Sequence, residues 1–259
     1  SSSCHPDDCR ITARMGSESI IDQILTTLHE AGHSFYEMGL PKEHYGMPLA
    51  EPISHAIHES ESRCWETRIG RTMAFWHFFL PKLKKVSSLT EEELFRAISR
   101  VKPTFIRTES DEITYPLHVI LRFEIEKELL TGKLQTKELS ERWRAGMKTL
   151  LGIEPPTDRQ GCLQDIHWSM GAFGYFPTYT LGNVIAAQLF EVFEQEYPNW
   201  QEKVKKGQFE FIKEWHLENV HQHGRRYSSK ELVEKISGKK LSSQPYTSYL
   251  TTKYQAIFP

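Results

Sequence analysis

Two histidines at positions 29 and 33, with a glutamate between them, have the spacing of a metal site. Residues 29–33 read His-Glu-Ala-Gly-His. On a helix, side chains four residues apart project from the same face, so both rings can place a nitrogen about 2.0–2.1 Å from one Zn²⁺. The carboxylate of Glu30 can then take a proton from an attacking water and pass it to a leaving amine. The spacing predicts metal-assisted hydrolysis, although a solvent-facing helix can contain the same five residues by chance.

A catalytic zinc site usually takes a third protein ligand and keeps one position open. Four candidate ligands follow close together on a second predicted helix: His55, His58, Glu59 and Glu61. Position 39 is Gly, which excludes the pattern with a third His six residues after the motif. We predict Glu59 as the third ligand, with Glu61 or a histidine as the alternative. A His₂Glu set suits Zn²⁺, and Co²⁺ or Mn²⁺ can substitute for it.

Helical periodicity dominates the segments that must position these residues. Apolar residues from Ile20 to Phe35 recur every three or four positions, with Ser17 or Ser19 as the N-cap and Gly39 as the stop. A second helix is predicted from near Pro52 to the stop at Pro81, with Glu59 inside it. Further helices are predicted to begin at Thr90 and at Pro116, and to cover 136–150, 181–196, 210–221, 230–236 and 246–257.

Alternation typical of strands is scarce. We therefore predict a mainly α fold with at most a short β ribbon, near Tyr45–Ile53 or Gly161–Ser169. The loop from Gly152 to Gly161, rich in proline and polar residues, is the one plausible internal boundary. We treat residues 1–259 as one catalytic domain.

Charge and composition narrow the choice of partners. A net charge of −2 and a pI near 6.6 leave no basic field for nucleic acid or an anionic membrane. The longest mainly apolar stretch, 73–80, is too short to span a bilayer. Four cysteines without a C-x-x-C pair, and a start without the pattern of a secretory signal, favour the cytoplasm. A small or peptide substrate is the expectation.

Four motifs in order along the chain resemble those of the carboxypeptidase Taq family of metallocarboxypeptidases. The first is His-Glu-Ala-Gly-His, and the second is His-Glu-Ser-Glu-Ser-Arg at 58–63. Residues 106–111 are similar to that family's Ile-Arg-x-x-Ala-Asp motif, with Ser110 where Ala is usual. Residues 161–168 fit its Gly-x-x-Gln-Asp-x-His-Trp motif fully.

The resemblance implies a zinc-dependent carboxypeptidase that releases C-terminal amino acids from peptides. It also implies a helical fold of the neurolysin and angiotensin-converting-enzyme-like group, with a groove beside which the short ribbon would lie, and often a homodimer. Family members are about twice as long, and the His-Pro-Phe motif that precedes this region in them is absent, because His5-Pro6 is followed by Asp7. The chain therefore resembles the C-terminal, metal-bearing half, and we expect an N-terminal half as a partner.

The resemblance also suggests roles outside the metal site. His167 and Tyr179 are the expected donors to the oxyanion, with Tyr175 as an alternative to Tyr179, because related helical metallopeptidases use a His and a Tyr about a dozen residues apart. Asp165, two residues before His167, is expected to fix its tautomer. Core packing is the alternative for either tyrosine.

A carboxypeptidase must bind a free terminal carboxylate, and an arginine fork is the usual means. Arg107, in the matched motif, is our candidate, with Arg10, Arg225 and Arg226 in reserve. The alternative for Arg107 is a structural salt bridge with Glu109 or Asp111. At the level of function, the alternatives are an endopeptidase or dipeptidyl carboxypeptidase of the same group and a non-catalytic metal-binding fragment.

Overall fold

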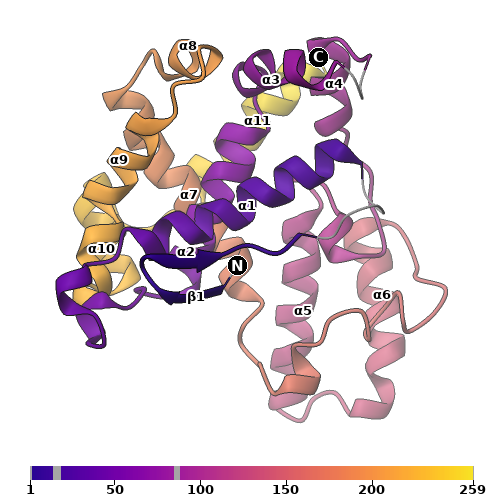
Figure 1. Ribbon diagram of the computed structural model, residues 1–259. Helices are drawn as coiled ribbons and strands as arrows, with labels where there is room; N and C mark the ends of the chain where they lie inside the picture. The colour runs from indigo at the N-terminus through magenta and orange to yellow at the C-terminus, as the bar shows by residue number, and fades with distance from the viewer. Residues whose placement is uncertain (1, 14–18, 85–87, 259) are drawn as a thin grey trace. The chain divides into compact units, whose positions relative to one another are not determined.

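A computed structural model describes residues 2–13, 19–84 and 88–258, and they are mainly helical (Figure 1). The chain divides into two compact units. The first combines Ser1–Ile98 with Leu181–Pro259, and the second is Ser99–Thr180. The mainly α prediction is confirmed. The loop at 152–161, predicted as a boundary, lies inside the second unit.

The described residues contain one small sheet, in the first unit. Strand β1 (Ser2–His5) pairs antiparallel with β2 (Asp8–Arg10). The predicted location of the ribbon was wrong, because 45–53 contains the 3₁₀ turn η2 (Pro48–Ala50) and 161–169 contains turns and the start of η7 (Trp168–Met170). Prolines at 48 and 52 lack the N–H that a strand ladder needs, which disfavours a ribbon in the first of these segments.

Helix α1 (Ile20–Met38) carries the histidine motif and confirms the predicted bounds. Its N-cap is Ser19, whose side chain accepts a hydrogen bond from the backbone N–H of Asp22. Ser17, the other predicted cap, lies outside the described residues. Gly39 is the C-cap, as predicted.

The helix predicted from Pro52 to Pro81 is instead three successive segments. They are α2 (His55–Arg63), the π-helix η3 (Cys64–Gly70) and α3 (Met73–Phe79). Ser54 caps α2, and Thr72 caps α3 by accepting from the N–H of Phe75. A cap inside the predicted helix satisfies the N–H groups of a new start, which explains the interruption.

The rest of the first unit is also helical. Its further elements are η1 (Lys42–His44), η4 (Leu80–Leu83), α4 (Glu91–Ile98), α7 (Pro177–Glu196, of which residues from Leu181 belong here), α8 (Trp200–Lys205), α9 (Glu210–Asn219), η8 (His221–Arg226), α10 (Ser229–Ser237) and α11 (Gln244–Ile257). Of the α-helices in this list, only α8 was not predicted, and the short helices η1, η4 and η8 were not predicted either. The core of this unit includes Tyr36, Ile57, Phe75, Trp76 and Phe193, each at most 1% exposed.

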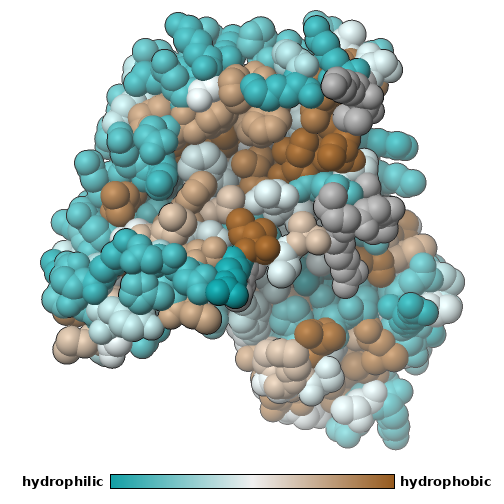
Figure 2. Space-filling view, viewed as in Figure 1, coloured by the Kyte–Doolittle hydropathy of each residue, from teal (hydrophilic) through white to brown (hydrophobic). Residues whose placement is uncertain are grey.

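The second unit is built on a helix pair. Its elements are η5 (Arg107–Glu109), α5 (Tyr115–Leu130), η6 (Thr136–Glu138), α6 (Leu139–Leu151) and η7, and α5 packs against α6 around Leu121, Ile125, Trp143 and Met147. Hydrophobic side chains also reach its surface, and brown atoms are visible over this unit in Figure 2. Leu163, Ile166 and Met170 are 69%, 66% and 68% exposed. Among the described helices, none has the length and hydrophobicity needed to cross a membrane.

Candidate active site

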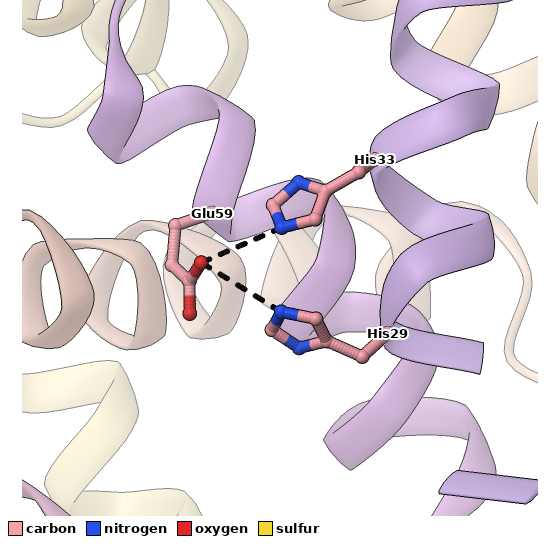
Figure 3. Close-up of side chains that lie close together, drawn as sticks. All are labelled: His29, His33 and Glu59. Atoms are coloured by element: carbon pink, nitrogen blue, oxygen red, sulfur yellow. Dashed lines mark ion pairs between the residues drawn. The ribbon is translucent and has the colours of Figure 1, made fainter. Parts of the chain in front are cut away.

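Two helices of the first unit bring the predicted metal ligands together. His29 and His33 lie one turn apart on α1, and Glu59 faces them from α2 (Figure 3). The Nε2 atoms of His29 and His33 are 3.9 and 3.7 Å from the same oxygen, Oε2 of Glu59. The carboxylate is buried, at 6% exposure for the residue, and both histidines are half-buried.

These distances fit three ligands around one ion. Two metal–ligand bonds of about 2.0–2.1 Å span at most about 4.2 Å, so each Nε2 and the Glu59 oxygen can bind the same metal without large movement. The three side chains form one of two described groups of His, Cys, Asp or Glu that have the geometry to hold a metal. A divalent cation would also offset the cost of a buried carboxylate.

Glycines make the close approach around Glu59 possible. A Cβ on Gly32, the fourth residue of the histidine motif, would lie 2.6 Å from the carbonyl oxygen of Glu61 and from Cα of Ser62, both backbone atoms of α2. A Cβ on Gly182 of α7 would lie 2.4 Å from Cγ of Glu59. Both positions therefore favour glycine, and sequence reasoning did not assign a role to either.

His29 is held on the side away from Glu59 by an acidic residue that the sequence analysis missed. Nδ1 of His29 lies 3.0 Å from Oε2 of Glu66, which sits in the π-helix η3. Arg63 donates to the same oxygen at 2.7 Å, and Arg71 lies 3.5 Å from the other. Burial would raise the pKa of Glu66, but Arg63, His29 and Arg71 outweigh it and lower that pKa. Burial likewise opposes the charge of His29, yet Glu59 and Glu66 raise its pKa.

His33 has a different partner. Its Nδ1 lies 2.6 Å from Nδ1 of His58, and Nε2 of His58 lies 2.9 Å from Oε1 of Glu37. Burial, with the rings of His29 and His58, lowers the pKa of His33 to about 2. His55, the other histidine considered beside Glu59, is exposed.

Glu30 is half-buried on α1, between His29 and His33 in sequence. Its role as a general base stays a prediction.

A second His and Glu cluster lies wholly inside the first unit. Oε2 of Glu61 is 2.7 Å from Nε2 of His221 and 2.9 Å from Nδ1 of His216. The three residues are at most 2% exposed. Burial would raise the pKa of Glu61, but the two histidines lower it to about 2. Burial would lower the pKa of His216, but Glu61 raises it. Glu61 is hydrogen-bonded to His221 and ion-paired with His216, so this cluster joins α2 to α9 and η8.

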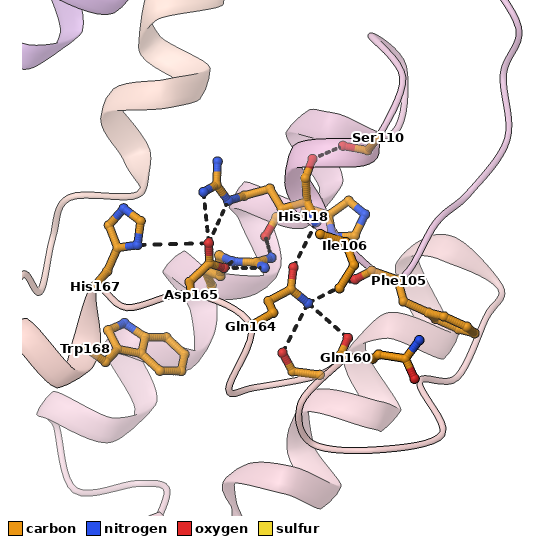
Figure 4. A network of polar contacts seen from close by, with 12 residues as sticks. Phe105, Ile106, Ser110, His118, Gln160, Gln164, Asp165, His167 and Trp168 are labelled. Carbon is orange, nitrogen blue, oxygen red and sulfur yellow. Dashed lines mark hydrogen bonds and ion pairs between the residues drawn. The ribbon is translucent and has the colours of Figure 1, made fainter. Parts of the chain in front are cut away.

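In the second unit, the two later motifs form one polar network (Figure 4). Asp165 accepts from Arg107 at 2.8 Å through Oδ1 and from Arg122 at 2.7 Å through Oδ2. Gln164 accepts from the backbone N–H of Arg107 at 2.8 Å and donates to the carbonyl of Phe105 at 2.9 Å. Gln164 and Asp165 therefore hold Arg107 in place.

Arg107 is buried, at 5% exposure, and its ion-pair partner is Asp165 rather than Glu109 or Asp111. Its remaining terminal nitrogen donates to the hydroxyl of Tyr115 at 3.1 Å. Burial opposes the charge, but Tyr115 and Asp165 raise the pKa of Arg107. A substrate carboxylate would have to share this guanidinium with Asp165. Arg122, which the sequence analysis did not single out, is fully buried in the same network.

His167 and Tyr179 meet as a pair. Nε2 of His167 lies 2.9 Å from the hydroxyl oxygen of Tyr179. The ring of Tyr175 is also close, with its centroid 5.3 Å from that of His167. Asp165 does not hydrogen-bond to His167, because its nearer oxygen is 4.0 Å from Nδ1. Burial lowers the pKa of His167.

Known proteins are similar to the chain in sequence and in fold. The family model of the carboxypeptidase Taq (M32) metallopeptidases matches residues 1–254, and the chain belongs to this family. It is 40% identical to thermostable carboxypeptidase 1 of Thermus thermophilus over 257 residues, which cover 98% of the chain and 50% of that relative. It is 37% identical to carboxypeptidase 1 of Bacillus subtilis over 256 residues, covering 97% of the chain and 51% of the relative.

Solved structures agree with this assignment. The M32 carboxypeptidase from Deinococcus radiodurans R1 superposes with a TM-score of 0.92 at 40% identity, covering 96% of the chain and 51% of that structure. The chain thus spans about half the length of the relatives it matches. The family implies a divalent metal, and the His29, His33 and Glu59 site fits one.

Proposed function

We propose that the chain carries the metal centre of a zinc-dependent carboxypeptidase that removes C-terminal residues from peptides. The convergence of His29, His33 and Glu59 on one point supports this most directly. The observation is specific because the three atoms come from two helices and still lie at distances that suit one ion.

When bound, zinc supplies a Lewis acid that polarises the scissile carbonyl and acidifies water. His29, His33 and Glu59 hold it. Glu30 takes the proton from the attacking water and delivers it to the amine that leaves. Co²⁺ and Mn²⁺ are candidate substitutes at a His₂Glu site.

Residues of the second unit complete the proposal. His167 and Tyr179 are proposed as donors to the oxyanion, supported by their 2.9 Å contact, and Tyr175 is the alternative phenol. Arg107 is proposed to bind the substrate carboxylate, with Asp165 holding its side chain. The grouping with neurolysin and angiotensin-converting enzyme stays a prediction.

The test is a metal and activity assay on the purified chain. The zinc content is measured first, and then hydrolysis of a peptide with a blocked amino terminus. We expect about one zinc per chain, which the double substitution His29→Ala with His33→Ala removes. Release of the terminal amino acid supports the proposal. Loss of zinc binding only on substitution elsewhere would contradict it.

The remaining partners are proposals of the same kind. Since the relatives are twice as long, we propose that residues 1–259 act as one catalytic domain together with a second half of the protein. Tight zinc binding without turnover, followed by turnover when a relative's N-terminal half is added, would support that arrangement. A homodimer and a cytoplasmic location are also proposed. The latter is consistent with Cys4, Cys9, Cys64 and Cys162 being free thiols.

A further inference from the structure

The ring nitrogens of His29 and His33 that face away from Glu59 have different partners. The partner of His33 is a third histidine. Each ring turns Nε2 toward Glu59. Behind them, Nδ1 of His29 meets the carboxylate of Glu66, whereas Nδ1 of His33 meets the ring nitrogen of His58. Among these described contacts, only the partner of His33 is itself an imidazole.

The positions of the protons on this side follow from the metal site. A metal binds the lone pair of a neutral imidazole, so Nε2 of His33 carries no proton and Nδ1 must carry it. That N–H points at Nδ1 of His58 over 2.6 Å. Two N–H groups cannot share this contact, so Nδ1 of His58 is the acceptor.

The same reasoning fixes the other side of His58. A neutral imidazole that accepts at Nδ1 has its proton at Nε2. This atom lies 2.9 Å from Oε1 of Glu37, and a carboxylate oxygen accepts from an N–H. His33 therefore donates to His58, and His58 donates to Glu37.

We propose that His58 and Glu37 are positioning residues that fix the tautomer and orientation of His33 for metal binding. This inference rests on the proposed metal site. Glu37 lies one turn after His33 on α1, and His58 directly precedes Glu59 on α2. This relay of hydrogen bonds thus runs from His33 on α1 to His58 on α2 and back to Glu37 on α1. Helix α2, which supplies the proposed third ligand Glu59, therefore also positions His33.

Packing keeps His58 in this orientation. The ring of Tyr36 lies 5.2 Å from that of His58 in an edge contact, and Tyr36 is fully buried. The hydroxyl of Tyr36 accepts from the backbone N–H of Ile53 at 3.0 Å, which fixes the tyrosine beside the start of α2. The ring of His58 therefore has a rigid neighbour as well as two polar partners.

Substitutions at His58 separate this role from general packing. His58→Leu removes the acceptor, whereas His58→Asn places an amide oxygen near the position of Nδ1 and can still accept. His77 is a matched control, because it pairs with Glu91 at 3.1 Å on the surface of the same unit. Glu37→Leu tests the far end of the relay at a half-buried position, in case His58→Leu does not fold.

Two measurements are made on each variant. The zinc dissociation constant is obtained by competition with a chromophoric chelator. In the Co²⁺-loaded protein, proton NMR counts the paramagnetically shifted, exchangeable ring N–H signals, of which the unchanged chain should show two. We expect His58→Leu to weaken zinc binding by about 10–100-fold and to lose one signal to exchange with water. His58→Asn should recover most of the affinity and both signals, Glu37→Leu should show a smaller loss, and His77→Leu should match the unchanged chain.

The outcomes are distinguishable. Tight zinc binding and two N–H signals that survive both His58→Leu and Glu37→Leu would overturn the relay and leave the metal site standing. Failure of the unchanged chain to bind zinc would overturn the proposed function, and the relay with it.

Discussion

Glu59 is a proposed metal ligand, whereas Glu30 is the proposed general base, so changes at these two carboxylates should have different effects. Glu59 converges with the two histidines, whereas Glu30 is one residue away from His29 along α1. Glu30→Gln should therefore keep zinc and lose about 10²–10⁴-fold in kcat, because the amide cannot take a proton. Zinc content and kcat are measured together. Glu43→Gln, at an exposed site of the same unit, is the control, and activity retained in Glu30→Gln would rule out the general base.

The proposed role of Arg107 in substrate binding needs a direct test, because Asp165 and Tyr115 already accept hydrogen bonds from its guanidinium. If it binds the substrate carboxylate, peptides with a C-terminal amide should be poor substrates, and Arg107→Lys should raise KM for free-acid peptides by about 10-fold or more, since the bidentate fork is lost. Initial rates with matched acid and amide peptides measure this. Equal cleavage of the two would refute the carboxylate clamp and favour an endopeptidase.

The spacing of His29 and His33 was sufficient to predict their convergence, because four residues on a helix always return to the same face. Glu59 needed the additional assumption that a second helix packs alongside. Glu66 and Arg122 were out of reach, since their contacts join residues 37 and 43 positions apart and depend on tertiary packing. The choice of His58 over His55 as the inward residue likewise depends on how α2 is rotated against α1.

At the scale of elements, the contact between α1 and α2 should be unusually sensitive to a methyl group. Gly32→Ala should destabilise the chain by about 1–3 kcal/mol, even though alanine favours helices, because the atoms it meets are backbone atoms that cannot move aside. The free energy of unfolding in urea measures the change. Thr26→Ala, exposed on the same helix, should change it by less than about 0.5 kcal/mol, and a Gly32→Ala chain as stable as this control would show that the helices can separate.

Helix α5 contains a buried histidine that should make stability depend on pH. Burial lowers the pKa of His118 to about 3, and Arg122 adds to the effect. The unfolded chain, with a pKa near 6.5, binds the proton more readily, so the contribution of His118 is complete above pH 6.5 and is lost as the pH falls toward 3.

The unfolding free energy of the unchanged chain should therefore fall relative to that of His118→Gln by about 3 kcal/mol between pH 7 and pH 4. Urea unfolding at each pH measures the two curves. His77→Gln, at an exposed site, should run parallel to the unchanged chain. A constant gap between the unchanged chain and His118→Gln would show that His118 does not titrate differently on folding.

Element boundaries followed the sequence where the sequence offered capping residues. Ser19, one of the two predicted N-caps, and Gly39 bound α1, and Gly132, at φ +71°, follows the end of α5. The segment from Pro52 to Pro81 was predicted as one helix because its apolar period continues through Thr72. The interruption depends on the capping hydroxyl of Thr72 and on the π-helix before it, and neither can be predicted from the spacing of apolar residues.

On the scale of the whole molecule, the mainly α class was predictable from periodicity, whereas the division into two units was not. The second unit is an insertion between Ile98 and Leu181, and no change of composition marks its ends. The strand pair was misplaced because three or four residues around Pro6 give too short an alternation to read.

The central claim is that one divalent metal is held by His29, His33 and Glu59. It also requires the Glu61, His216 and His221 cluster to stay free of metal, since its atoms are already at hydrogen-bond distance. An anomalous difference map from crystals of the zinc-loaded chain, collected on both sides of the zinc edge, tests both statements at once. The account predicts one peak bounded by Nε2 of His29, Nε2 of His33 and the Glu59 carboxylate. A peak at Glu61, or none beside Glu59, would contradict it.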